Sequence, residues 1–126
     1  MANVTTQNIS LTAGITPTYN SASTGGDTVT IGNAERDYIH VKNAAASPVT
    51  LTIAPQVTSV YQDGVGNVTP ASLSISIPAT TGEKIIGPFP SAYINSSNGT
   101  VSLSWSSSTS VTFAALTLPA VSRGFM

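Results

Sequence analysis

Apolar and polar residues alternate along much of the chain, most clearly between residues 38 and 53. Ile39 and Val41 alternate with polar or aromatic neighbours, and residues 49–53 place three apolar side chains between threonines. Strict alternation is typical of a half-buried antiparallel strand, because successive side chains leave opposite faces of the pleat. The intervening residues 43–48 are small and include a proline, which favours a short connection. We therefore expect two strands joined as a hairpin at the centre of a sheet.

The same period of two recurs in further short segments, and none of the chain has a sustained helical period. The clearest of these segments are 28–31, 73–77, 101–105 and 111–118. Clusters of Gly, Pro, Asn and Ser separate them at intervals of roughly 8–12 residues, as in sandwiches and barrels. The pattern predicts an all-β fold: an antiparallel β-sandwich of jelly-roll or Greek-key type with about eight short strands.

The two ends of the chain differ from its middle. Residues 1–20 alternate only weakly, which indicates an N-terminal arm or edge strand; 21–118 form the sandwich domain, and 119–126 form a C-terminal tail. Both ends carry apolar side chains that a lone monomer would bury with difficulty, so we expect them to bind a partner. The candidate partner-binding residues are Ile9, Leu11, Ile15, Tyr19, Val121, Phe125 and Met126.

Composition excludes several classes of function. The 126 residues suit one domain, and the absence of cysteine excludes disulfides and thiolate metal sites. Five acidic and four basic side chains give a net charge of −1, so we expect no binding to nucleic acid or to anionic membranes. No apolar run approaches the roughly 20 residues of a membrane helix. The N-terminus has no pattern of a secretory signal, so we expect the chain to be made in the cytoplasm and not exported by that route.

Candidate catalytic chemistry is sparse. His40 is the only histidine, so a Ser-His-Asp triad would need it, but its neighbours do not resemble a nucleophile elbow. We expect it to be a surface or inter-subunit hydrogen-bonding residue. The segment 63–67 lacks the lysine and following helix of a phosphate loop and the oxygen ligands of a calcium loop, which favours a plain turn. We expect no catalytic residues, metal or cofactor.

The remaining charged and aromatic residues give four expectations. The charged segment 32–37 is expected to be a solvated loop. Trp105 alternates in phase with apolar residues, so we place it in the core. Phe89 lies between two prolines, a rigid corner that can plug the open end of a sandwich. A platform for sugar would instead need exposed aromatic side chains, for which Tyr38, Tyr61 and Tyr93 are the candidates.

Three local patterns together resemble a known family. They are Tyr-Ile-His-Val-Lys-Asn at 38–43 followed by Val-Thr-Leu-Thr-Ile at 49–53, Gly-Glu-Lys-Ile-Ile-Gly-Pro-Phe-Pro at 82–90, and the two alternating runs within 101–116. In this order they are similar to small β-sandwich structural proteins of tailed bacteriophages, of the capsid decoration (cement) type. The resemblance covers roughly residues 11–118.

This resemblance implies a non-enzymatic protein of the virion that binds the exterior of the capsid and stabilises it. It implies the major capsid protein as partner and a homo-oligomer, most often a trimer, with no catalytic residues and no cofactor. Two alternatives stay open. One is a neck, head-fibre or tail component of the phage, and the other is a carbohydrate-binding or host-adhesion module.

Overall fold

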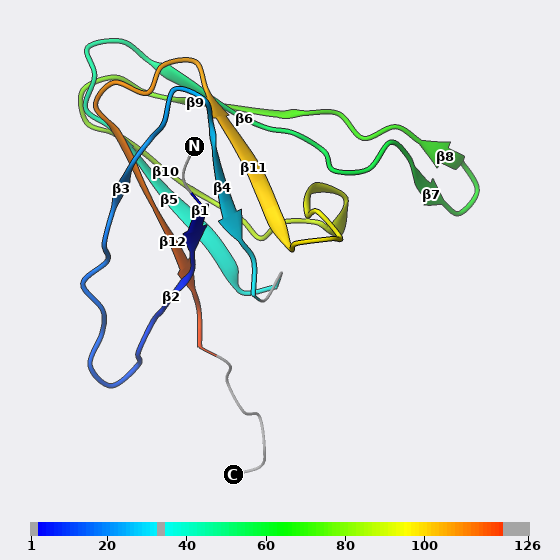
Figure 1. The fold of residues 1–126 in the computed structure, drawn as a ribbon, viewed down its shortest axis with the longest axis horizontal. Helices are drawn as coiled ribbons and strands as arrows, with labels where there is room; N and C mark the ends of the chain where they lie inside the picture. The colour runs from blue at the N-terminus through cyan, green and yellow to red at the C-terminus, as the bar shows by residue number, and fades with distance from the viewer. Residues whose placement is uncertain (1–2, 33–34, 120–126) are drawn as a thin grey trace.

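The computed structural model describes residues 3–32 and 35–119, in which two larger β-sheets pack face to face and a third, two-stranded sheet lies outside them (Figure 1). The strands are β1 (Asn3–Thr5), β2 (Gln7–Asn8), β3 (Asn20–Ser21), β4 (Asp27–Thr30), β5 (Asp37–Asn43), β6 (Val49–Ile53), β7 (Val60–Gln62), β8 (Gly66–Val68), β9 (Leu73–Ile77), β10 (Gly82–Ile86), β11 (Thr100–Trp105) and β12 (Val111–Thr117). A single turn of 3₁₀-helix, η1 (Ser91–Tyr93), precedes β11. The predicted all-β sandwich is confirmed.

The two sheets are mixed rather than wholly antiparallel. The first has the order β1-β4-β11-β6-β9, and the second has the order β10-β5-β12-β2 with β3 also on β12. Two pairs, β1 with β4 and β2 with β12, are parallel, whereas the others are antiparallel. Both parallel pairs arise because the N-terminal segment joins the edge of each sheet without a hairpin turn.

The predicted hairpin between residues 38 and 53 is wrong, because β5 and β6 lie in different sheets. β5 pairs with β10 and β12, and β6 pairs with β9 and β11. The connection crosses from one sheet to the other, and the buried side chain of Asn43 holds it. Its amide nitrogen donates to the carbonyls of Ser47 and Pro78, and its oxygen accepts from the backbone of Ala45. Alternation shows which face of a strand is buried, but it does not identify the neighbouring strand.

The core lies between the two sheets and follows the predicted inward positions. Its largest fully buried side chains are Phe113, Ile39, Leu51, Ile53, Ile77, Val29, Val41, Val49, Val101 and Val111. Phe89 is 4% exposed and packs into this cluster, as expected for the proline-bounded corner. Trp105 is half-buried and packs against Phe113, with 5.3 Å between ring centroids. The core therefore fixes both sheets without a disulfide.

Two aspartates are buried, and one of them, Asp37, corrects the prediction that the charged segment 32–37 is a solvated loop. Asp37 begins β5 and is 1% exposed, and its Oδ2 accepts the backbone N–H of Gly32 at 2.8 Å. Asp27 is equally buried, and its Oδ2 accepts from the backbone of Ser23 and from Nε1 of Trp105, both at 2.9 Å. Each carboxylate accepts hydrogen bonds from a turn next to its own strand, which compensates for its burial.

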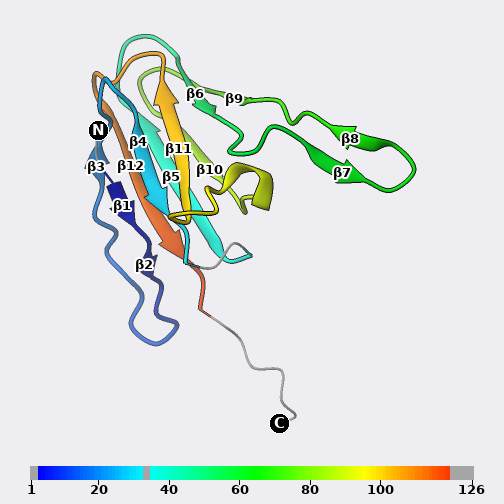
Figure 2. The same ribbon diagram turned by 45° about the vertical axis from the view of Figure 1, so that its right-hand side comes forward.

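A two-stranded arm leaves the body of the sandwich (Figures 1 and 2). The ladder between β6 and β9 continues, after an interruption, as the ladder between β7 and β8. The turn between β7 and β8 contains Asp63, which agrees with the predicted turn. We call residues 54–72 the arm.

Candidate binding surface

The N-terminal segment closes one side of the sandwich. β1 lies against β4 in the first sheet, and two residues later β2 lies against β12 in the second. Val4 is 7% exposed and belongs to the core. Residues 3–8 are thus edge strands of both sheets, and the projecting part of the N-terminal region begins after them.

Residues 9–19, which we call the N-terminal loop, project from one end of the sandwich and return as β3. Gln7 closes the base of the loop, since its side-chain amide donates to the Thr18 carbonyl at 2.8 Å and its oxygen accepts the Thr18 N–H at 2.9 Å. A turn within the loop is held by the bond from Gly14 N–H to the Ser10 carbonyl at 2.9 Å. The loop is therefore anchored at both ends and braced internally.

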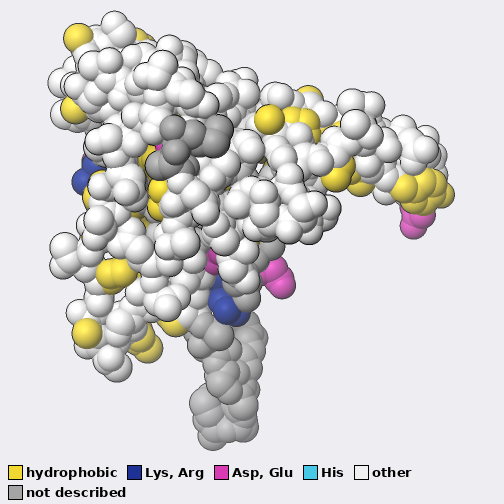
Figure 3. Space-filling model, in the orientation of Figure 1, with side chains coloured by type: hydrophobic (Ala, Val, Ile, Leu, Met, Phe, Trp, Pro, Cys, Tyr) yellow, Lys and Arg dark blue, Asp and Glu magenta, His cyan; other side chains and the backbone are white. Residues whose placement is uncertain are grey.

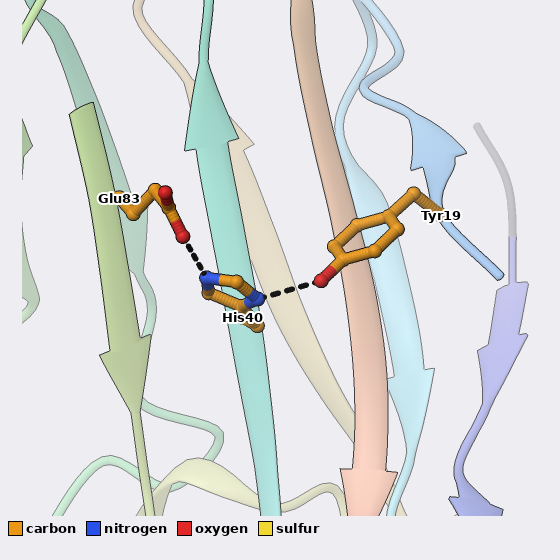
Figure 4. A network of polar contacts seen from close by, with 3 residues as sticks. All are labelled: Tyr19, His40 and Glu83. Atoms are coloured by element: carbon orange, nitrogen blue, oxygen red, sulfur yellow. Dashed lines mark hydrogen bonds and ion pairs between the residues drawn. The ribbon is translucent and has the colours of Figure 1, made fainter. Parts of the chain in front are cut away.

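A second anchor is a chain of three side chains, Tyr19, His40 and Glu83, which we call the latch (Figure 4). The Tyr19 hydroxyl lies 2.7 Å from Nδ1 of His40, and Nε2 of His40 lies 2.7 Å from Oε1 of Glu83. Tyr19 reaches from the end of the loop across β12 to β5, and Glu83 comes from β10. Nζ of Lys42 lies 4.2 Å from the Tyr19 ring centroid, a cation–π contact. Three segments distant in sequence are thereby joined on the outer face of the second sheet.

The latch explains why an outward-facing residue of β12 is buried. Ala114 pairs with His40 and faces outward with it, yet it is completely buried. Tyr19 crosses β12 here, so the side chain from the N-terminal loop covers a strand that alternation alone would leave exposed (Figure 4).

The chemistry of the latch suits a structural role in either charge state of the imidazole. A neutral ring accepts at Nδ1 from the tyrosine hydroxyl and donates from Nε2 to the carboxylate of Glu83. A protonated ring donates from both nitrogens, and the hydroxyl turns to accept. Both bonds of His40 are made within the chain, to a tyrosine and a glutamate rather than to a serine.

The structure separates the predicted partner-binding residues. Leu11 is 91% exposed and Ile15 is 37% exposed on the N-terminal loop, whereas Ile9 is half-buried at its base. Tyr19 is half-buried and engaged in the latch. The other predicted residues, Val121, Phe125 and Met126, lie outside the described residues.

The N-terminal loop and the end of β12 lie at the same end of the sandwich (Figures 1 and 2). The backbone N–H of Ile9 donates to the carbonyl of Thr117 at 3.1 Å. Ile9, Leu118 and Pro119 together line a shallow hollow beside Arg36. We call this end of the molecule the loop end.

The three candidate tyrosines of a sugar platform do not come together. Tyr93 is buried, and its hydroxyl donates to the Ala71 carbonyl at 2.6 Å. Tyr38 is half-buried on β5, and Tyr61 is 69% exposed on the arm. Within residues 3–32 and 35–119, no three potential ligands gather as a metal site, and no helix has the length and apolarity to cross a membrane.

Sequence reasoning missed the arm and the latch. The exposed apolar side chains of the arm are Val57, Val60, Tyr61 and Val65, and Figure 3 shows apolar side chains along this projection. The Asp63-Gly64 dipeptide was the available sequence signal for a hairpin, and Val60 pairs with Val68 across this turn. In the latch, Tyr19 and His40 are 21 positions apart in the sequence, and His40 and Glu83 are 43 positions apart. No local sequence pattern indicates such contacts.

Comparison of the chain with protein-family models, with curated proteins and with solved structures gives no match. The surface is therefore interpreted from its own geometry.

Proposed function

We propose that the chain is a non-enzymatic structural protein of a tailed-phage virion, which binds the major capsid protein on the outside of the shell and stabilises the shell. The observation that carries this proposal is the anchored N-terminal loop, which presents Leu11 with 91% of its surface exposed. Gln7 and the latch hold this loop, so its exposure is a property of an ordered element. The sequence resemblance supplies the class of partner.

An anchored loop is well suited to binding. Its backbone is ordered before contact, so association costs less conformational entropy than docking of a free segment. Burial of one large aliphatic side chain contributes roughly 1.5–3 kcal/mol. Such a modest contact is sufficient where many copies act on a repeating lattice, because linked contacts strengthen one another. The resemblance further favours a homo-oligomer, with a trimer as the proposed state.

Rebinding to particles that lack the protein tests this proposal. The double variant Leu11→Ser and Ile15→Ser removes apolar surface from the loop without touching Gln7 or the latch. We expect its affinity for the particles to fall at least about tenfold, since 1.4 kcal/mol corresponds to a factor of ten. Val65→Ser is the matched control, because Val65 is also exposed but lies on the arm. Unchanged affinity of the loop variant, with its fold intact by circular dichroism, would contradict the proposal.

The neck, head-fibre and tail alternatives would use the same loop end but a different number of copies per particle. The carbohydrate-binding alternative has less support, because only Tyr61 among the three candidate tyrosines is largely exposed. A sugar site built on aromatic stacking would therefore depend on Tyr61 alone. A glycan array that shows binding abolished by Tyr61→Ala would favour this alternative over the capsid proposal.

A further inference from the structure

Residues 10–14 of the N-terminal loop form a closed turn, which we call the tip turn. Its ends are joined by the bond from the Gly14 N–H to the Ser10 carbonyl, and the Ala13 N–H donates to Oγ of Ser10 at 3.2 Å. Gly14 has a φ of +67°, in the left-handed region that commonly closes such turns. The backbone of the turn is therefore bonded within the chain before any partner arrives.

Leu11 is the side chain that this turn offers to a partner. It is 91% exposed, the largest exposed fraction among the large apolar side chains of residues 3–32 and 35–119. The hydroxyls of Ser10 and Thr12 beside it lie 3.3 Å apart and bond to each other. A partner therefore gains most by covering Leu11, and a single side chain is covered well only by a socket that surrounds it.

The N-terminal loop carries no charge. Residues 3–26 contain no acidic, basic or histidine side chain, and the loop shows only apolar and uncharged side chains at the lower left of Figure 3. Arg36 and Asp37 line the hollow beside Ile9 at the base of the loop. Asp37 is 1% exposed, and Nε of Arg36 donates to the Leu118 carbonyl. The tip turn therefore meets its partner without a charge of its own.

We propose that the tip turn inserts Leu11 into an uncharged apolar socket on the major capsid protein. This inference rests on the proposed function and adds the chemistry of the partner surface at that site. A charged group in the socket would lose hydration against the leucine and would find no opposite charge on the loop. Burial of apolar surface therefore holds the contact, and charge pairing does not.

The single leucine also argues against a lipid surface as the partner. Even a complete myristoyl chain gives only marginal, reversible membrane binding, and a leucine side chain is far smaller. Residues 3–26 supply no basic side chain that would draw the loop to anionic headgroups. A protein socket, which can enclose the side chain, is the occupant that this geometry fits.

Two replacements of Leu11 test whether burial of apolar surface holds the contact. Leu11→Met keeps apolar surface of similar volume, and Leu11→Asn puts a polar side chain in its place. In rebinding to particles that lack the protein, we expect Leu11→Asn to bind at least about tenfold more weakly than Leu11→Met. Equal affinity of the two variants would overturn the socket.

A pair of opposite charges tests whether the socket is uncharged. Ala13 is exposed in the same turn, so Ala13→Glu and Ala13→Lys place either sign beside Leu11. We expect both variants to weaken particle binding, to within about threefold of each other, because a charge of either sign is moved from water to apolar surface. Tighter binding of one variant would reveal a charged socket, and wild-type affinity of both would show that the turn is not covered. Either result would overturn the proposal.

The salt dependence of wild-type binding is a second test of the same point. Between about 0.1 M and 1 M sodium chloride the screening length falls from about 10 Å to about 3 Å. We expect the dissociation constant to rise by less than about threefold over this range, because the tip turn has no charge to be screened. A larger loss of affinity from intact particles would show that charge pairing carries the contact.

Gly14→Ala tests whether the turn is formed before binding. A methyl group at Gly14 meets no atom within 4 Å, so this variant strains the left-handed backbone and leaves Leu11 unchanged. We expect it to bind particles at least about threefold more weakly than wild type. Gly25→Ala is the matched control, because its methyl group is equally unobstructed and its φ is not left-handed. Equal affinity of the two variants would overturn the role of the preformed turn.

These experiments separate the socket from the proposed function. Wild-type binding that is salt-sensitive, or that favours one sign of charge at residue 13, would overturn the socket and leave the capsid role in place. Failure of the wild-type chain to bind particles at any salt concentration would overturn both. Self-association lost in Leu11→Asn would place the socket on a second copy, and binding to phosphatidylcholine–phosphatidylserine vesicles lost in that variant would place Leu11 in a membrane. Either result would overturn the assignment to the capsid protein.

Discussion

The hydroxyl of Tyr19 lies 2.7 Å from Nδ1 of His40, although the two residues are 21 positions apart in the sequence. This bond joins the N-terminal loop to β5, and the bond from His40 to Glu83 extends the connection to β10. The position of the loop is thus set by the second sheet. Because the base of the loop is held in place, its exposed apolar tip is presented in one orientation. Binding to many identical sites on a lattice needs this property.

Tyr19→Phe should lower the free energy of unfolding by about 1 kcal/mol, the typical net value of one hydrogen bond. The ring remains over β12 in this variant, so the change in the free energy of unfolding reports the contribution of the hydroxyl group alone. Urea denaturation gives the change, and hydrogen exchange of residues 10–18 should become faster. Tyr61→Phe on the exposed arm is the control, and an equal effect of the two variants would show that the latch contributes nothing specific.

Asp27→Ala should lower the free energy of unfolding by about 1–3 kcal/mol, because the N–H groups of Trp105 and Ser23 lose their acceptor. Asp27→Asn keeps an acceptor oxygen, so its free energy of unfolding should fall by less than that of Asp27→Ala. Trp105 is the only tryptophan, so its fluorescence reports on this site during denaturation. Asp63→Ala on the arm is the control for loss of one carboxylate. If Asp27→Ala and Asp63→Ala lowered the free energy of unfolding equally, the buried hydrogen bonds of Asp27 would make no net contribution to stability.

Gly82→Ala should lower the free energy of unfolding by at least about 2 kcal/mol, because a methyl group at this position would overlap the carbonyl of Pro78. The start of β10 thus lies too close to the preceding turn to leave room for a side chain. Gly25→Ala is the matched control, since a methyl group there meets no atom within 4 Å. Thermal unfolding of the two variants compares them directly, and equal melting temperatures would show that the turn is free to shift.

Removal of residues 1–8 should destabilise the fold itself, because Val4 is part of the core and β1 and β2 complete both sheets.

Replacement of residues 10–16 by a Gly-Ser segment of equal length should leave the melting temperature within a few degrees of wild type. It should nevertheless abolish binding to capsids. Differential scanning calorimetry distinguishes the two variants. A stable fold after the deletion would mean that the edge strands add little.

The alternation of side chains predicted which residues are buried, and it could not predict which strands pair. Ile39 and Leu51 lie in the core as expected, because a period of two reports one buried face. Their strands lie in opposite sheets because the buried amide of Asn43 bonds three backbone carbonyls of the crossing connection and of the end of β9. Such long-range bonds leave no periodic trace in a sequence.

The candidate surface was predictable only in part. The weak alternation of residues 1–20 indicated an arm or edge strand, and Leu11 and Ile15 are exposed. The anchoring of that segment depends on His40 and Glu83, which no local pattern connects to it. Asp37 lay in a stretch of three consecutive charges, which suggested solvent exposure, but its role as an acceptor for Gly32 places it inside.

The number of copies per virion tests the central claim most directly. Quantitative mass spectrometry of purified particles, with the major capsid protein as internal reference, gives this number. A protein that binds and stabilises the whole shell should be present in a number comparable to the shell protein. A number that matches a single ring at one vertex would contradict decoration and indicate a neck or tail component, and absence from the particle would contradict the structural role itself.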